Sequence, residues 1–176
     1  MNLRFPVSLA LLLTCAAASR SGQQSAPSVL TDADLSVGGL KWIPDTAEAR
    51  RVLGTPSTVK PYLTRIDDED LHLTDWMYPG LRLIFSQNGK LRWARVTGRA
   101  WPTHRGLRVG DSVSHIVALY GPPRNRSDNE YVYQLPGDSV KWRGGYLARP
   151  SRLGLFAVFE KGRVTTIGIG LIVEGD

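Results

Sequence analysis

The sequence contains one cysteine, Cys15, among 176 residues. A single cysteine cannot form a disulfide framework within the chain, and it cannot supply a cysteine-based metal site. No apolar run approaches the roughly 20 residues of a membrane-spanning helix. The chain also lacks the glycine-rich nucleotide-binding motifs and the nucleophile-elbow motif of common enzymes. These absences exclude a disulfide-stapled mini-protein and a protein built from transmembrane helices, and they leave enzymatic activity unsupported.

Histidine is also scarce, with His72, His104 and His115 widely separated. Their spacing does not match a metal-ligand pair, so surface histidines are the better interpretation. The acidic run 67–70 lacks the alternating carboxylates of a calcium loop, and a solvated loop is favoured there. We therefore expect no catalytic residue, no metal and no cofactor.

The balance of charge is basic, with 22 lysines and arginines against 16 acidic residues and a net charge of +6. The basic surplus is larger in residues 98–176 than in the preceding part of the fold. A solvated basic surface explains this surplus, and so does an acidic partner. Nucleic acid is not an expected partner, because the N-terminus carries an export signal.

Residues 1–18 have the features of a secretory signal, with Arg4 ahead of a short apolar core at 7–13. Two processing sites compete. The sequence before Cys15 resembles a bacterial lipobox, although Thr14 replaces the usual small residue, and lipidation of Cys15 would anchor the protein. Cleavage at the Ala-Ala-Ala site ending at residue 18 would instead release a soluble protein. We favour the lipoprotein, and both sites predict export.

Residues 19–30 are rich in serine, glutamine and alanine, and they are predicted to form a flexible tether. The remainder reads as a tandem repeat, residues 31–98 and 99–176, because helix and stop motifs recur in the same order. The first helix is predicted from the capping-box spacing of Asp45 and Glu48 and from the stop at Gly54. The second helix is predicted from the apolar face formed by Val113, Ile116, Val117 and Tyr120. Asp111 or Ser112 can cap its N-terminus, and Gly121 can end it.

Three strands are predicted after each helix. The predicted segments are 71–78, 81–85 and 90–96 in the first repeat, and 131–133, 153–159 and 164–173 in the second. A loop containing Pro61 and the acidic run precedes the first set, and Asn88-Gly89 is a hairpin turn signal. Gly168 and Gly170 leave one face of the last strand bare, which predicts close approach by another element or by a partner.

The predicted fold class is therefore α+β: a tandem repeat of a helix plus a three-stranded antiparallel sheet, with the helices packed on one sheet face.

The order of these motifs resembles the repeat of the SmpA/OmlA (BamE-like) and β-lactamase-inhibitor-protein-like group. In the second repeat the matching residues are Gly106, Gly110, Asp111, Tyr120-Gly121-Pro122-Pro123, Tyr131-Val132-Tyr133, Phe159 and Gly162-Arg163-Val164. In the first they are Leu53-Gly54-Thr55-Pro56, Trp76-Met77-Tyr78, Phe85 and Gly89-Lys90-Leu91, whereas Ile43-Pro44 replaces the usual Gly-Asp opening. The resemblance implies helices on an antiparallel sheet and a role in protein–protein contact rather than catalysis.

Aromatic residues supply the candidate binding site, because aromatic and arginine side chains dominate interface energetics. We expect some of the strand aromatics to line the sheet face away from the helices, although core packing is the alternative. These candidates are Trp76, Tyr78, Trp93, Tyr131 and Tyr133. An insert at 134–152 in the second repeat adds Trp142, Arg143, Tyr146 and Arg149, and a surface excursion folded back over the sheet is the alternative there.

The sequence as a whole predicts a non-catalytic, exported cell-envelope protein, lipid-anchored through Cys15, that binds another protein with an acidic surface. Outer-membrane assembly or maintenance is one such role. The first alternative is a soluble secreted or periplasmic inhibitor of an enzyme. A third hypothesis is an envelope hydrolase whose site cannot be recognised from sequence motifs.

Overall fold

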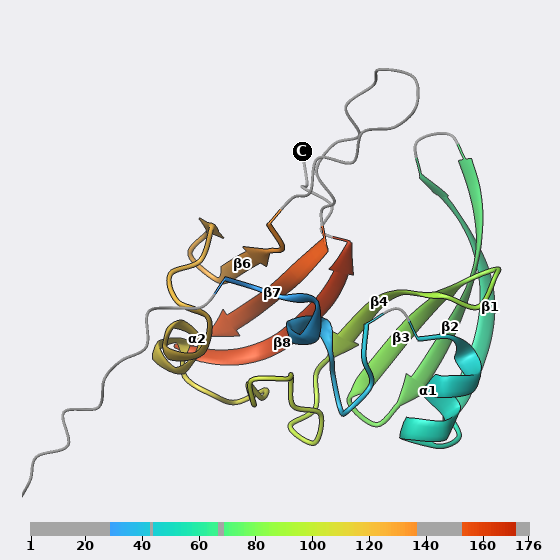
Figure 1. The fold of residues 1–176 in the computed structure, drawn as a ribbon, viewed down its shortest axis with the longest axis horizontal. Helices are drawn as coiled ribbons and strands as arrows, with labels where there is room; N and C mark the ends of the chain where they lie inside the picture. Colours follow the sequence, from blue (N-terminus) through green and yellow to red (C-terminus); the bar gives the residue numbers. More distant parts are fainter. Residues whose placement is uncertain (1–28, 43, 67–68, 137–152, 172–176) are drawn as a thin grey trace, which may run out of the picture.

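The computed structural model describes residues 29–42, 44–66, 69–136 and 153–171. In these ranges the chain forms a short 3-10 helix, two α-helices and eight strands (Figure 1). The helices are η1 (Asp32–Leu35), α1 (Thr46–Leu53) and α2 (Val113–Tyr120). The strands are β1 (Thr58–Ile66), β2 (Glu69–Tyr78), β3 (Leu81–Ser86), β4 (Leu91–Val96), β5 (Asn125–Arg126), β6 (Glu130–Gln134), β7 (Leu153–Glu160) and β8 (Arg163–Leu171).

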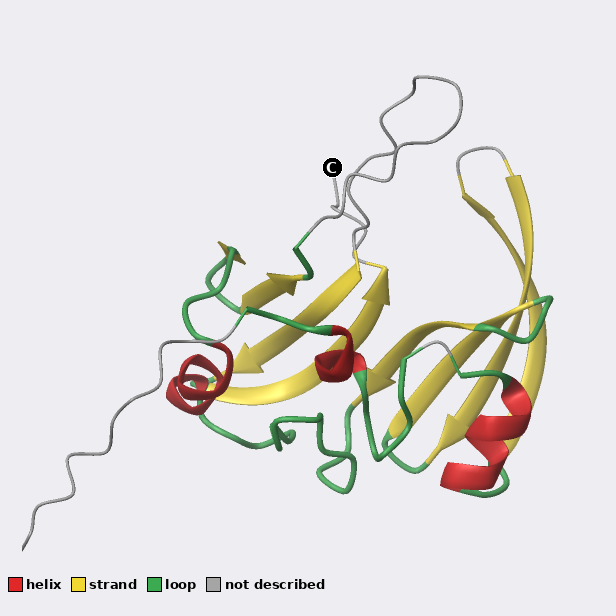
Figure 2. Ribbon diagram, in the orientation of Figure 1, coloured by secondary structure: helices red, strands yellow, loops and turns green. Residues whose placement is uncertain are grey.

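The strands form one antiparallel sheet in the order β1-β2-β3-β4-β8-β7-β6-β5. The predicted pair of helix-plus-three-stranded units is therefore wrong. Four strands follow each α-helix, and β4 pairs with β8, so one sheet crosses the predicted repeat boundary. The α-helices have eight residues each, and Figure 2 shows how small they are beside the sheet.

The two strands absent from the prediction lie at the edges of the sheet. Pro61 made the segment of β1 resemble a loop, because proline cannot donate to a strand ladder. An edge strand tolerates proline where its N–H would face away from the neighbouring strand, and β1 pairs with β2 alone. The other missed strand, β5, has two residues, which is too short to show any alternation.

Both predicted helix boundaries are confirmed. The Asp45 carboxylate accepts a hydrogen bond from the Glu48 N–H at 2.8 Å, and the Ser112 hydroxyl accepts one from the His115 N–H at 3.2 Å. Gly54 and Gly121 end the helices with φ values of 80° and 77°. A residue with a Cβ atom is strained at positive φ, so glycine is suited to both positions.

One face of the sheet packs against the helices and carries the core. The Tyr78 hydroxyl donates to the Gly54 carbonyl at the end of α1, and the Tyr133 hydroxyl donates to the Gly121 carbonyl at the end of α2, each at 3.1 Å. The segment that contains η1 crosses the same side of the sheet (Figure 1) and buries four aliphatic side chains, those of Leu30, Leu35, Val37 and Leu40. Leu30 was assigned to the tether, but it belongs to this core.

A buried ion pair fastens that N-terminal segment to the second half of the chain. Arg105 Nε and Nη2 donate to the two carboxylate oxygens of Asp34, each at 2.6 Å, and Asp34 is 1% exposed. Arg105 Nη1 donates to the Leu119 carbonyl at 2.8 Å, and the guanidinium carbon lies 4.9 Å from the centroid of the Tyr120 ring. One side chain therefore joins η1, the loop before α2, and the last turn of α2.

Candidate partner-binding face

Strand side chains on the sheet face opposite the helices are less buried than those that form the core on the other face. Paired residues of an antiparallel ladder point to the same face, so the register assigns every strand residue to one side. Core-face residues such as Leu83, Ala94 and Ile167 are fully buried. The apolar residues of the other face are half-exposed, namely Tyr62, Leu71, Leu73, Met77, Ile84, Trp93, Val132, Phe156 and Val158. We call these residues, with Lys60, Asp75, Arg82 and Arg95, the open sheet face.

Two stacked aromatic rings form the centre of the open sheet face. The Trp93 and Phe156 ring centroids lie 6.2 Å apart with planes 20° from parallel. A Cβ atom on Gly168 would overlap the Phe156 ring, and one on Gly170 would lie 2.9 Å from Trp93 Cδ1. The two rings, from β7 and β4, therefore lie over Gly168 and Gly170 of β8. This confirms the prediction that another element approaches the glycine face of the last strand closely. The result is a flat aromatic surface supported directly by backbone.

An ion pair lies beside the aromatic rings. Asp75 is 4% exposed, and both of its carboxylate oxygens accept from Arg82 Nε, at 2.9 and 2.8 Å. Arg82 Nη2 lies 2.8 Å from Asp75 Oδ2. The hydrogen bonds that Arg82 donates to Asp75 raise the pKa of Arg82, and burial opposes this. Burying a carboxylate is costly unless it is paired, so Asp75 fixes the Arg82 guanidinium at the surface.

The pair also affects a neighbouring tyrosine of the open sheet face. Burial raises the pKa of Tyr62; the nearby Arg82 charge opposes that rise and the Asp75 charge adds to it. Tyr62 therefore stays neutral near physiological pH, as a half-exposed aromatic ring with a polar tip. Such a side chain is suited to an interface that is partly apolar and partly polar.

The open sheet face is basic near these residues. Arg95 on β4 lies directly opposite Arg82 on β3, and Lys60 on β1 lies opposite Asp75. Arg95 and Lys60 are exposed, and neither has a carboxylate within ion-pair distance among the described residues. Asp75 is the carboxylate paired with this cluster in the ladder, and Arg82 neutralises it. An acidic group from outside would relieve the repulsion between the two arginines.

Of the aromatic candidates that the structure describes, Trp93 alone lies on the open sheet face. Trp76, Tyr78 and Tyr133 are on the core face and are 5%, 8% and 5% exposed, so they pack in the core. Tyr131 also lies on the core face, where its ring is edge-on to that of Phe159 with the ring centroids 4.9 Å apart. The remaining candidates, Cys15, Trp142, Arg143, Tyr146 and Arg149, lie outside the described residues.

Sequence reasoning missed Tyr62, Asp75 and Phe156. Tyr62 belongs to β1, which was predicted to be a loop. Phe156 alternates with the buried Leu155 and Ala157, and that alternation was the available signal for its face. Nothing in the sequence pattern identifies Asp75 as the partner of Arg82, because the two residues meet only through the β2–β3 register.

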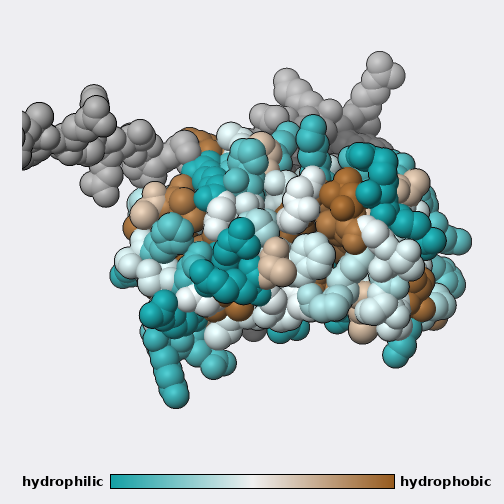
Figure 3. All heavy atoms as spheres, turned by 90° about the horizontal axis from the view of Figure 1, so that it is seen from below, coloured by the Kyte–Doolittle hydropathy of each residue, from teal (hydrophilic) through white to brown (hydrophobic). Residues whose placement is uncertain are grey.

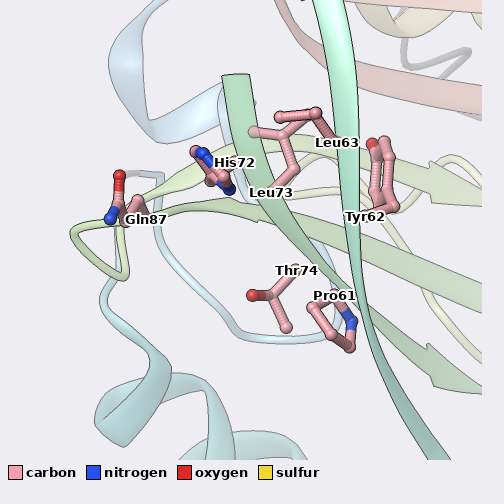
Figure 4. A pocket seen from close by; sticks show the side chains of 7 residues that line it. All are labelled: Pro61, Tyr62, Leu63, His72, Leu73, Thr74 and Gln87. Atoms are coloured by element: carbon pink, nitrogen blue, oxygen red, sulfur yellow. The ribbon is translucent and has the colours of Figure 1, made fainter. Parts of the chain in front are cut away.

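An open hollow lies at the outer part of the β1–β2 hairpin (Figure 4). Its volume is about 420 Å³, and it is lined by Pro61, Tyr62, Leu63, His72, Leu73, Thr74 and Gln87. A second hollow of about 370 Å³ shares three of these residues and continues to Leu71, Ser86 and Arg92. On the side shown in Figure 3, by contrast, apolar residues form separate patches between polar ones.

The described ranges hold no group of three or more His, Cys, Asp or Glu side chains that could bind a metal ion. No helix in the described part of the chain is long and apolar enough to cross a membrane.

Comparisons with known proteins add one structural similarity. No protein-family model matches the chain, and no curated protein matches it. Among solved structures, it is similar to the crystal structure of the uncharacterized protein yfeY from Escherichia coli, with a TM-score of 0.44 and 14% sequence identity. That match covers 78% of this chain and 97% of the other. A similarity at this level carries no argument about function.

Proposed function

We propose that the protein is an exported, non-catalytic binding protein whose open sheet face docks the acidic surface of another protein. The observation that carries the proposal is the group formed by Trp93, Tyr62, Arg82 and Arg95 on a sheet face with half-exposed side chains. Tryptophan, tyrosine and arginine are the residue types that dominate protein interfaces. Arg82 is already oriented by Asp75, so little side-chain entropy is lost when it binds.

The local surplus of positive charge at Arg82 and Arg95 indicates the chemistry of the partner. Arg82 and Arg95 lie side by side on adjacent strands, and one carboxylate is present to balance them. A carboxylate from a partner can bridge the two guanidiniums while its apolar neighbours cover Trp93 and Ile84. Charge complementarity of this kind speeds association and selects the partner, and added salt weakens it.

Capture from envelope extracts tests the proposal when charge-reversed variants are compared. Arg95→Glu should abolish capture of the protein that wild type retains, and salt should weaken wild-type capture. The matched control is Arg126→Glu, an exposed arginine whose position in β5 belongs to the core side of the sheet. If both variants capture the same protein as wild type does, the open sheet face is not the binding site.

We also propose that the protein is exported and anchored through Cys15, which the lipobox-like sequence and the motifs resembling the SmpA/OmlA group support. The intact mass of protein purified from the envelope tests this proposal. A diacylglycerol adduct on an N-terminal Cys15 is the expected result. An unmodified N-terminus at Ser19 would show a released protein instead.

A further inference from the structure

Strand β2 extends beyond its neighbour on one side. It pairs with β1 from Glu69, opposite Ile66, to Met77, opposite Thr58. Its pairing with β3 begins only at Leu73, opposite Ser86. The β1–β2 hairpin consequently runs out past the end of the β3–β4 hairpin (Figure 1). Within the described part of the chain, the segment Asp70–His72 has a strand on one side and none on the other.

The direction of the backbone groups in this segment follows from the ladders. The Met77 carbonyl accepts from the Ser57 N–H at 2.8 Å, so Met77 directs its backbone groups toward β1. Ser86 donates its N–H to Lys90 at 2.9 Å, so Ser86 faces β4 and Phe85 faces β2, opposite Thr74. Along a strand, the N–H and C=O groups of successive residues point alternately toward the neighbour on one side and the neighbour on the other. The N–H and C=O groups of Asp70 and His72 therefore point to the vacant side.

Two hollows adjoin that vacant position and share His72, Leu73 and Gln87. The first also contains the core-face residues Pro61, Thr74 and the exposed Leu63, together with Tyr62 of the open sheet face, and Figure 4 shows Gln87 at its end. The second also contains Leu71 of the open sheet face and Arg92. An added strand would direct alternate side chains into one hollow and then the other.

The lining residues indicate what such a strand would carry. Leucines in both hollows favour apolar side chains. Arg92 is exposed and has no carboxylate within ion-pair distance among the described residues, so it favours an acidic side chain on the side of the open sheet face. Unpaired backbone groups favour an extended main chain, which supplies affinity through strand addition.

We propose that the vacant side of β2 at Asp70–His72 binds an extended peptide segment of a partner protein, with alternating apolar and acidic residues, in line with β3. This site borders the open sheet face and shares Tyr62, Leu71 and Leu73 with it, but it binds through the main chain of β2, so its test does not depend on the docking function proposed above.

A short synthetic peptide of alternating valine and glutamate, blocked at both ends, is the probe. Amide NMR spectra of the whole protein should show shifts and slowed hydrogen exchange at His72 as the peptide is added. His72→Pro should weaken binding about fivefold, the loss expected when one hydrogen bond of about 1 kcal/mol is removed. His72→Ala is the matched control and should bind as wild type does, because it keeps the N–H.

His72→Pro removes no hydrogen bond of the β1–β2 ladder, since the His72 N–H points away from β1. The thermal midpoint of each variant checks that the fold is kept. If the proline variant does not fold, a peptide N-methylated at alternate residues makes the same test, because it lacks donors but keeps its side chains. Arg92→Gln should weaken binding, and Arg92→Lys should restore part of it.

Several results would overturn the proposal. One is the absence of any shift at His72 at millimolar peptide. Another is binding that is unaffected by both His72→Pro and N-methylation. A third is a dimer in sedimentation experiments that His72→Pro dissociates, because the site would then receive a second copy of this chain.

Discussion

Arg105 shows at the scale of one residue how this chain closes its fold. Its guanidinium carries hydrogen bonds to Asp34 and to the carbonyl of Leu119, and it stacks on Tyr120. A buried carboxylate is tolerated only while this partner is present, so removal of one member leaves an uncompensated charge in the core. No local sequence pattern indicates this pair, because its members are 71 residues apart.

Replacing Arg105 by methionine should lower the free energy of unfolding by about 3–5 kcal/mol, the range seen when one partner of a buried ion pair is removed. Adding Asp34→Asn to this variant should recover part of the loss, because no buried charge then remains. Urea denaturation of both variants measures this. Equal stability of the single and double variants would mean that Asp34 is not charged in the core.

The same pair predicts a dependence of stability on pH. Burial raises the pKa of the Asp34 carboxyl, but hydrogen bonds from Arg105 and Thr31 outweigh burial and hold it below its ordinary value of 3.8. A carboxyl with a lowered folded-state pKa stabilises the fold above its unfolded-state pKa, and the contribution disappears as pH falls through the folded-state value. Urea midpoints from about pH 6 to pH 2 should therefore converge for wild type and Asp34→Asn as acidity rises.

Gly168 tests the aromatic surface at the residue scale. Gly168→Ala places a methyl group against the Phe156 ring, so the ring must move away from β8. We expect a loss of about 1–3 kcal/mol in the free energy of unfolding, the usual cost of overpacking. The double variant Gly168→Ala, Phe156→Ala should not add the two single losses, because the clash is gone. Additive losses would show that the ring does not lie over Gly168.

At the scale of the elements, the local rules of the sequence were sufficient for the helices and insufficient for the sheet. Caps and stops placed α1 and α2 because both depend on a few neighbouring residues. The strand count failed at the edges, where Pro61 and a two-residue strand carry no alternating pattern. The pairing of β4 with β8 depends on contacts far apart in sequence, so no local rule indicated one continuous sheet.

The helix stops make a prediction of their own. Gly54→Val and Gly121→Val should each destabilise the protein by about 1–2 kcal/mol, because both residues have positive φ and a β-branched side chain resists that conformation. A Cβ on Gly54 would meet no atom within 4 Å, so at that position the loss reports conformation rather than a clash. Equilibrium unfolding measures it, and neutral substitutions would contradict the stated role of these glycines.

The whole molecule is a single sheet with one face closed and the other uncovered by its described helices. This difference explains how far the binding site could be predicted. All the strand aromatics were named as candidates by residue type; Trp93 lies on the uncovered side, whereas Trp76, Tyr78 and Tyr133 lie in the core. Residue type does not determine the face; the register of each strand determines it, and the register became known only from the structure.

Site-specific photo-cross-linking tests the central claim that the open sheet face binds a partner. A benzophenone side chain at Ile84, between Asp75 and Trp93 in the ladder, should give one partner adduct in the native envelope. The same group at Val117, which is 38% exposed on α2, should give none. Arg95→Glu should remove the Ile84 adduct. An adduct at Val117 without one at Ile84, or an Ile84 adduct unchanged by Arg95→Glu, would contradict the account.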